Sequence, residues 1–193
     1  MPVAVAKCLA DYLLRVNSLE MMAEELRVKI ARNPYFQVET VFERMDKFKK
    51  GYLVPDDFNE YMLESKLYPS ELEQYLVFRD FDVERAGVVT VEHFRAEILP
   101  QEHASLAKEV LARRYYEGGF RLPLDLEYLL GRYFEHKLKS IKELGRIRAE
   151  MTQHQVYVVE ESFGLLDQLK DGVLSEPGKL DGFLRSRGKV TRK

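Results

Sequence analysis

Three segments of the chain repeat one spacing of residues that could bind a cation. In each segment an aspartate is followed five residues later by a glycine, and two residues further on by an aliphatic side chain. The three sets are Asp46, Gly51 and Leu53; Asp82, Gly87 and Val89; and Asp167, Gly172 and Leu174. A calcium-binding loop needs an oxygen ligand at its first position, a glycine for the sharp turn at its sixth, and an apolar anchor near its end.

Most of the other ligand positions in two of these loops lack a suitable oxygen. Calcium takes six or more oxygens, which come from loop positions 1, 3, 5, 7 and 9 and from an acid at position 12. The loop over 46–57 places Phe48 and Lys50 at two of these positions, where the ammonium would repel a cation. The loop over 167–178 ends on Gly178, so its closing acid is missing. We expect no metal in these two loops, and no other cofactor.

The loop over 82–93 retains the largest set of oxygen ligands. Its candidate calcium ligands are Asp82, Glu84, the Val88 carbonyl and Thr90. Its last position holds His93, whose nitrogen is a poor ligand for a hard cation. We therefore expect weak calcium binding at most.

Apolar residues one helical turn apart flank each loop. They are Phe42, Met45, Phe58 and Tyr61 around the first loop, Phe78, Phe81, Phe94 and Ile98 around the second, and Phe163, Leu166, Leu180 and Phe183 around the third. This spacing predicts that each loop joins two helices that pack through burial alone.

Two long amphipathic helices are expected besides these motifs. The first covers about thirty residues and ends at Asn33-Pro34, because proline cannot continue a helix. Its apolar stripe consists of Leu9, Tyr12, Val16, Leu19, Met22, Leu26 and Ile30. The second begins near Leu126. A helix is also expected over 101–117, and Ser70 with Glu73 has the spacing of a capping box that starts a helix.

The chain also contains an internal repeat. A shift of 121 residues (167 minus 46) carries Asp46 onto Asp167, Tyr12 onto Tyr133 and Arg27 onto Arg148. Each copy is a long helix followed by helix–loop–helix motifs, but the second copy has only one motif. We expect an all-α fold with two domains. Residues 1–117 hold a long helix and two motifs, and residues 118–193 hold a long helix, the third motif and a basic tail.

The odd number of motifs predicts a partner for the third. Its apolar face could pack on the long helices, pair with the same motif of a second copy, or bind another protein. The candidate contact residues are Phe163, Leu166, Leu174, Leu180, Phe183, Arg185, Arg187 and Lys189.

Composition excludes several classes of function. The 193 residues carry a formal net charge of −2, which disfavours general nucleic-acid binding. The single cysteine suits a reducing compartment, and neither a signal peptide nor a membrane-spanning segment is expected. No P-loop, dinucleotide-binding or hydrolase motif occurs, so we expect a non-catalytic cytoplasmic protein.

The loop pattern resembles the EF-hand superfamily of calmodulin-like proteins. The resemblance covers residues 36–100 as a pair of hands and 157–187 as a single hand. It implies that Leu53 faces Val89 across the short antiparallel bridge through which EF-hands pair. Residues 78–82 and 94–100 resemble the second hand of multi-hand proteins of cilia and flagella, several of which lie on axonemal doublet microtubules. The resemblance implies a structural adaptor of the axonemal cytoskeleton, largely independent of calcium, with tubulin and neighbouring axonemal proteins as partners. The alternative is a low-affinity calcium sensor that acts through the loop over 82–93.

Overall fold

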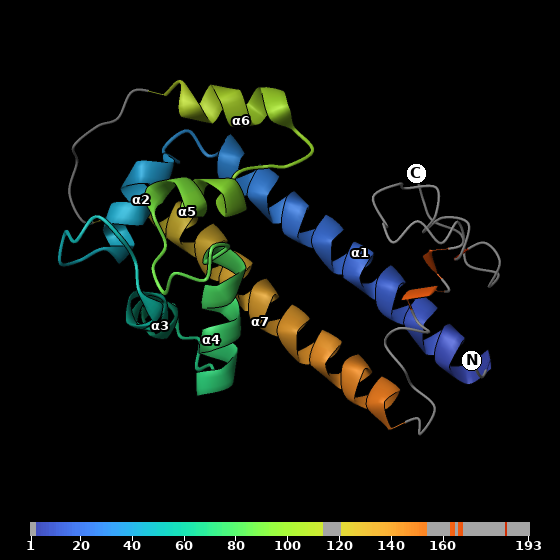
Figure 1. Ribbon diagram of the computed structural model, residues 1–193. Coiled ribbons are helices and arrows are strands. Elements are labelled where there is room, and N and C mark those ends of the chain that lie inside the picture. The colour runs from blue at the N-terminus through green and yellow to red at the C-terminus, as the bar shows by residue number, and fades with distance from the viewer. Residues whose placement is uncertain (1–2, 114–120, 154–162, 165, 168–183, 185–193) are drawn as a thin grey trace. The chain divides into compact units, whose positions relative to one another are not determined.

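The described part of the protein is helical. The computed structural model describes residues 3–113, 121–153, 163–164, 166–167 and 184. The helices are α1 (Val3–Arg32), α2 (Val38–Met45), α3 (Pro55–Glu64), α4 (Glu71–Phe81), α5 (Val91–Ile98), α6 (Ala104–Leu111) and α7 (Leu124–Thr152) (Figure 1). The predicted all-α class is therefore confirmed for these residues. None of the helices described is both long and apolar enough to cross a lipid bilayer.

Local sequence signals set several helix ends. α1 ends at Arg32, directly before Asn33-Pro34. At the start of α4 the Ser70 Oγ accepts a hydrogen bond from the Glu73 N–H at 3.4 Å, and Glu73 Oε2 accepts one from the Ser70 N–H at 2.8 Å. The predicted capping box is thus confirmed. The helix predicted over 101–117 is shorter, because α6 ends at Leu111, and residues 114–120 lie outside the described part.

The chain forms two compact units. The larger unit contains residues 20–142, and the smaller unit combines residues 1–19 with 143–193. Each unit therefore uses one part of α1 and one part of α7. The predicted division into residues 1–117 and 118–193 stays a prediction, because its boundary lies among residues 114–120, which are not described.

The larger unit contains two helix–loop–helix motifs. The first motif consists of α2 and α3 with the loop between them, and the second consists of α4 and α5 with theirs. The two loops meet at an antiparallel bridge between Leu53 and Val89, where each backbone N–H donates to the other residue's carbonyl at 2.9 Å. This bridge confirms the predicted contact, and both side chains are fully buried.

Aromatic rings from both motifs pack against the first half of α7 in the larger unit. The Phe58 ring lies 5.4 Å from Phe78, 4.9 Å from Phe81 and 6.1 Å from Phe134 between ring centroids. Phe81 also stacks on Phe94 at 5.5 Å. Buried aromatic rings of this kind contribute both apolar area and specific edge and face contacts. The residues that flank the first two loops therefore form the core, as their spacing predicted.

The smaller unit has a separate core. Its buried residues are Leu9, Ala10, Met151, Leu166 and Leu184. The predicted stripe of α1 is only partly buried, since 36% of Val16 and 49% of Met22 are exposed to solvent. The predicted long helix is confirmed, and burial varies along its stripe because helical spacing shows which side chains share a face but not where a packing partner begins and ends.

Candidate functional site

The first aspartate of each described loop binds backbone groups of its own loop. Asp46 accepts hydrogen bonds from the Lys50 N–H at 2.9 Å and the Gly51 N–H at 2.7 Å. Asp82 accepts them from the Ala86 N–H at 2.9 Å and the Gly87 N–H at 2.8 Å. Both carboxylates are buried, and each holds its loop closed with both of its oxygens. These two aspartates are thus structural within the loops as described.

The two loops also share an unusual backbone conformation. Gly51 has a φ of 81° and Gly87 a φ of 76°, which is the left-handed region that glycine adopts without strain. Two positions earlier, Lys49 and Arg85 also have positive φ, at 53° and 56°. The predicted requirement for glycine at the sixth position is confirmed in both loops. In the third loop, Asp167 is buried and its N–H donates to the Phe163 carbonyl at 2.8 Å, whereas Gly172 and Leu174 lie outside the described residues.

A lysine ammonium occupies the loop over 46–57. Lys50 Nζ lies 2.8 Å from Asp57 Oδ1 and 2.7 Å from Asp57 Oδ2. Asp57 stands at the twelfth position, where a calcium loop carries its bidentate acid, and it also accepts the Val54 N–H at 2.7 Å. The acid is buried, and its charge is balanced by the ammonium. Lys50, which would repel a metal ion, therefore supplies the positive charge that balances Asp57 in this loop.

The loop over 82–93 is arranged differently at its twelfth position. His93 Nε2 lies 3.6 Å from Glu84 Oε1, and His93 Nδ1 is buried without a hydrogen-bond partner. Thr90 Oγ1 accepts the His93 N–H at 3.3 Å and so caps α5. Of the candidate calcium ligands, Asp82 and Thr90 are thus engaged with backbone N–H groups, while Glu84 is mostly exposed.

No group of three or more His, Cys, Asp or Glu side chains that could hold a metal ion occurs among the described residues. The assignment of Asp82, Glu84, Val88 and Thr90 as weak calcium ligands stays a prediction.

The predicted contact residues of the third motif fall into three groups. Leu166 is buried in the core of the smaller unit, whereas 39% of Phe163 is exposed. Leu166 therefore packs against the long helices, which is one of the three arrangements left open by the sequence. The others are Leu174, Leu180, Phe183, Arg185, Arg187 and Lys189, and they lie outside the described residues.

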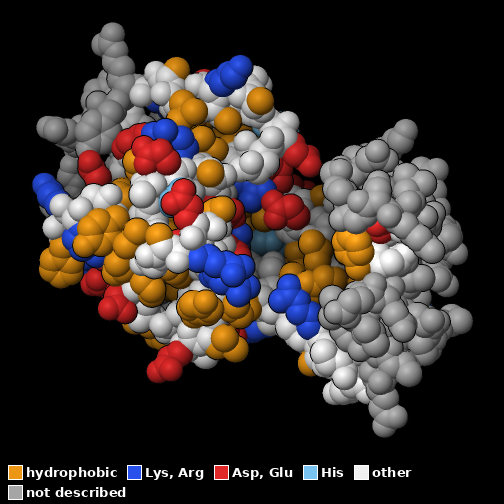
Figure 2. All heavy atoms as spheres, in the orientation of Figure 1, with side chains coloured by type: hydrophobic (Ala, Val, Ile, Leu, Met, Phe, Trp, Pro, Cys, Tyr) orange, Lys and Arg blue, Asp and Glu red, His pale blue; other side chains and the backbone are white. Residues whose placement is uncertain are grey.

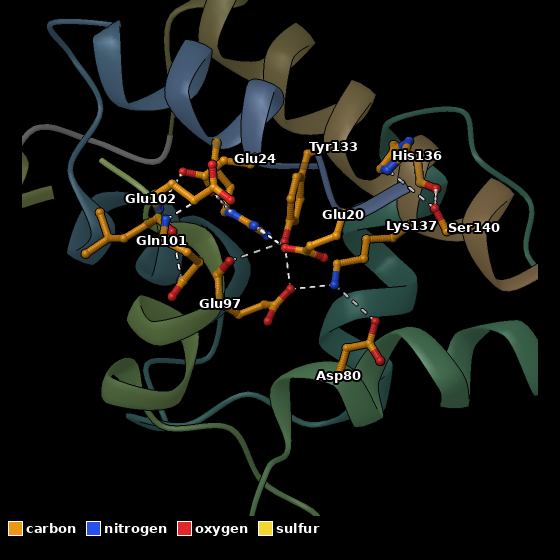
Figure 3. Close-up of polar contacts among 12 residues, drawn as sticks. Glu20, Glu24, Asp80, Glu97, Gln101, Glu102, Tyr133, His136, Lys137 and Ser140 are labelled. Carbon is orange, nitrogen blue, oxygen red and sulfur yellow. Dashed lines mark hydrogen bonds and ion pairs between the residues drawn. The ribbon is translucent and has the colours of Figure 1, made fainter. Parts of the chain in front are cut away.

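A buried acid in the larger unit fixes the segment that follows α5. Glu24 accepts hydrogen bonds from the backbone N–H groups of Gln101 at 3.0 Å and Glu102 at 2.9 Å, and from Arg27 Nε at 2.9 Å (Figure 3). His103 Nδ1 lies 3.2 Å away. Burial by itself raises the pKa of Glu24, but these hydrogen bonds outweigh burial and lower the pKa to about 2. Glu24 is therefore ionised at neutral pH and ties α1 to the start of the α5–α6 connection.

A second set of polar contacts joins α7 to the second motif. The Tyr133 hydroxyl donates to Glu97 Oε1 at 2.9 Å, and Lys137 Nζ pairs with Glu97 and, at 3.1 Å, with Asp80 (Figure 3). Burial raises the pKa of Tyr133, so its hydroxyl stays protonated and donates. Burial lowers the pKa of Lys137, but its anionic neighbours outweigh burial and raise the pKa. These contacts hold α4 and α5 in register on α7.

Sequence reasoning missed this polar network. The only available signal was the pairing of Glu24 with Arg27, three residues apart on a helix otherwise assigned by its apolar stripe. Both side chains are buried, and Arg27 also pairs with Glu20. A charged pair within an apolar stripe indicates a buried network, but its distant partners become visible only in the folded chain.

The first testable prediction concerns Lys50. In Lys50→Gln the Asp57 carboxylate loses its cation while it stays buried, so the free energy of unfolding should fall by about 1–2 kcal/mol. Urea unfolding followed by circular dichroism measures this. Lys139→Gln, which removes the same charge from an exposed pair with Glu135, should change the free energy by less than about 0.5 kcal/mol. Equal stability of Lys50→Gln and the wild type would contradict the role given to Lys50.

The second prediction concerns the pH dependence of stability that Glu24 causes. Its pKa is lowered in the folded state, so its stabilising contribution is complete above the unfolded pKa and is lost as the pH falls toward about 2. At pH 7, Glu24→Gln should cost roughly 2–3 kcal/mol, and this difference from the wild type should shrink between pH 5 and about pH 2. Urea unfolding at a series of pH values measures the difference. The exposed neighbour Glu25 provides the control, and Glu25→Gln should change the free energy of unfolding at pH 7 by less than about 0.5 kcal/mol.

Comparison with known proteins adds no relative to these observations. Neither a protein-family model, nor a curated protein, nor a solved structure matches this chain.

Proposed function

We propose that this chain is a non-catalytic structural adaptor of the axonemal doublet microtubule, in which an EF-hand pair holds its shape without calcium. The observation that carries the proposal is the contact of Lys50 Nζ with both oxygens of Asp57. A loop that contains its own cation has no need of a metal ion to balance its acids.

Several features of the larger unit support the EF-hand pair. Its two loops have the same aspartate caps, the same left-handed glycines and the Leu53–Val89 bridge. The apolar residues on both sides of each loop are buried together. These are the packing features of a pair of hands, and they are present alongside loops that lack most calcium ligands.

Electrostatics disfavour calcium in the loop over 46–57. A divalent ion about 4 Å from the Lys50 ammonium would meet a repulsion of roughly 8 kcal/mol at an effective dielectric constant of about 20. The other side-chain positions offer little compensation, because Phe48 at the third position has no oxygen and Asp57 at the twelfth is already paired with Lys50. The pair of hands therefore has no ion-driven opening at this loop with which to signal.

An exposed stripe on the second motif supports the adaptor role. Leu72 and Tyr75 are exposed and lie three residues apart, so they share one face of α4, and Tyr68, which precedes the helix, is exposed as well. The Arg79 guanidinium lies 6.0 Å from the centre of the Tyr75 ring. Tyrosine and arginine are enriched at the centres of protein interfaces. Figure 2 shows hydrophobic side chains in several groups between charged ones on the visible face.

The microtubule as partner is supported by the resemblance of residues 78–100 to hands of axonemal proteins and by the basic residues at 185–193. Basic side chains would complement the acidic surface of tubulin.

The third prediction tests this partner. The full chain should co-sediment with polymerised tubulin equally well in calcium and in a calcium chelator. The combined variant Arg185→Ala, Arg187→Ala and Lys189→Ala should bind about tenfold more weakly because three cations are lost from the contact. The matched variant Arg132→Ala, Lys139→Ala and Arg146→Ala removes the same charge from the exposed side of α7 and should bind as the wild type does. Absence of the wild-type chain from the pellet in both buffers would overturn the proposal.

A low-affinity calcium sensor is the second candidate, and one observation favours it. The loop over 82–93 has no lysine paired with its twelfth position, so Glu84 and Asp82 have no built-in cation between them. Calcium could enter there by displacing the backbone hydrogen bonds of Asp82.

Calorimetry with calcium tests the sensor and gives the fourth prediction. On the adaptor proposal, titration of the full chain should give no binding heat at calcium concentrations up to about 1 mM, because this loop offers too few oxygen ligands. Heat that is present in the wild type, persists in Lys50→Gln and disappears in Asp82→Ala would establish the sensor instead.

A further inference from the structure

The helix α4 carries apolar side chains on two opposite faces. One face belongs to the core, where Phe78 and Phe81 are buried against Phe58 with ring centroids 5.4 Å and 4.9 Å away. The opposite face contains Leu72 and Tyr75, of which 66% and 54% are exposed to solvent. A surface helix normally carries polar residues on the side opposite its apolar stripe. The outer face of α4 departs from this pattern, and its composition is that of a contact surface.

A row of three residues runs along this outer face. Glu71, Tyr75 and Arg79 follow one another at intervals of four residues, and such residues are neighbours on the surface of a helix. The Arg79 guanidinium lies 6.0 Å from the centre of the Tyr75 ring. Leu72 and the half-buried Leu76 lie beside the row. The row therefore begins with an acid, has an aromatic ring at its middle and ends with a cation.

The two charges of this row differ from the other charges of α4. Glu73 pairs with Lys142 at 3.3 Å, and Asp80 pairs with Lys137 at 3.1 Å. Glu71 and Arg79 are both exposed, and within the described part of the chain neither of them forms an ion pair. The charges beside α7 are thus balanced, whereas those of the outer face are available to a partner.

The row is complementary to a second copy of itself turned end to end. When two copies of α4 lie antiparallel with Tyr75 at the centre of the contact, Glu71 of each copy comes beside Arg79 of the other. Two ion pairs then form by symmetry, and Leu72 and Leu76 of the two copies come within one helical turn of each other. A parallel arrangement would instead place like charges together. The order of the charges therefore favours one geometry, which is the two-fold contact of a homodimer.

We propose that the outer face of α4 binds the same face of a second copy of this chain, in an antiparallel two-fold contact centred on Tyr75. Tyr68, which precedes α4, and Val83, which follows it, are exposed, and this arrangement brings Tyr68 of one copy to the same end as Val83 of the other. The apolar side chains supply the affinity, and the two ion pairs fix the direction. The proposal goes beyond the adaptor function, because the contact needs no other protein.

The fifth prediction is tested by sedimentation of the full chain over a range of concentrations. The contact is a single pair of short helices, so we expect a dissociation constant on the order of 10–100 μM. The wild type should therefore approach twice the mass of one chain as its concentration rises through this range. Added salt should weaken the dimer, because exposed ion pairs are screened.

Two charge reversals test the antiparallel geometry. Arg79→Glu places like charges opposite each other at both ends of the contact, and so does Glu71→Arg. Each variant alone should raise the dissociation constant at least tenfold. An equimolar mixture of the two variants should form the dimer again, because every cation of one variant then faces an acid of the other. The control is Lys108→Glu at an exposed position of α6, which changes the net charge as Arg79→Glu does and should dimerise as the wild type does.

Circular dichroism and thermal melting of each variant establish that the fold is retained. If either reversal unfolds the chain, Leu72→Lys replaces it and should also raise the dissociation constant at least tenfold, because an exposed helical position tolerates lysine. A wild type that stays monomeric, single variants that dimerise as the wild type does, a mixture that fails to dimerise, or a Lys108→Glu variant that dissociates would each overturn the proposal. No tubulin is present in this experiment, so its outcome is independent of the test of microtubule binding.

Discussion

The contact between the two helix–loop–helix motifs of the larger unit depends on the burial of aromatic rings. Phe58 and Phe81 belong to different motifs, and both lie against Phe134 of α7. Each such ring buries enough apolar area to contribute several kcal/mol, so the geometry of both loops follows from side-chain packing. This packing brings the two loops close enough for their backbones to form hydrogen bonds, and the Leu53–Val89 bridge results.

The electrostatics of the larger unit are consistent with a shape that is set by packing. Its buried acids are balanced by groups of the chain itself: Asp57 by Lys50, and Glu24 by Arg27 and two backbone N–H groups. Breaking a buried pair is costly even where forming it adds little net stability, so such contacts fix one arrangement against alternatives. A protein built in this way suits a rigid connecting role better than a role that requires opening.

The sequence predicted features that depend on local rules. The helices, the Ser70 cap and the left-handed glycines follow from residue type and spacing, whereas the Leu53–Val89 bridge was expected from the resemblance of the paired loops to EF-hands. It did not predict that Val16 and Met22 are exposed, because burial depends on which segment packs there. From the sequence, Lys50 was expected only to repel a cation. Its contact with Asp57 was not predicted, because that contact depends on the conformation of the whole loop. The contacts of Glu24 with residues far along the chain have no local signature at all.

The division of both long helices between the two units has a consequence for synthesis of the chain. The larger unit needs residues up to about 142, and the core of the smaller unit joins Leu9 and Ala10 to Leu184. During translation the N-terminal part of α1 therefore emerges well before the segments that cover it. Its apolar residues remain available to chaperones, or to other nascent chains, until the segment that contains Leu184 has left the ribosome. The smaller unit can therefore form only after Leu184 has emerged, whereas the larger unit needs no residue beyond about 142.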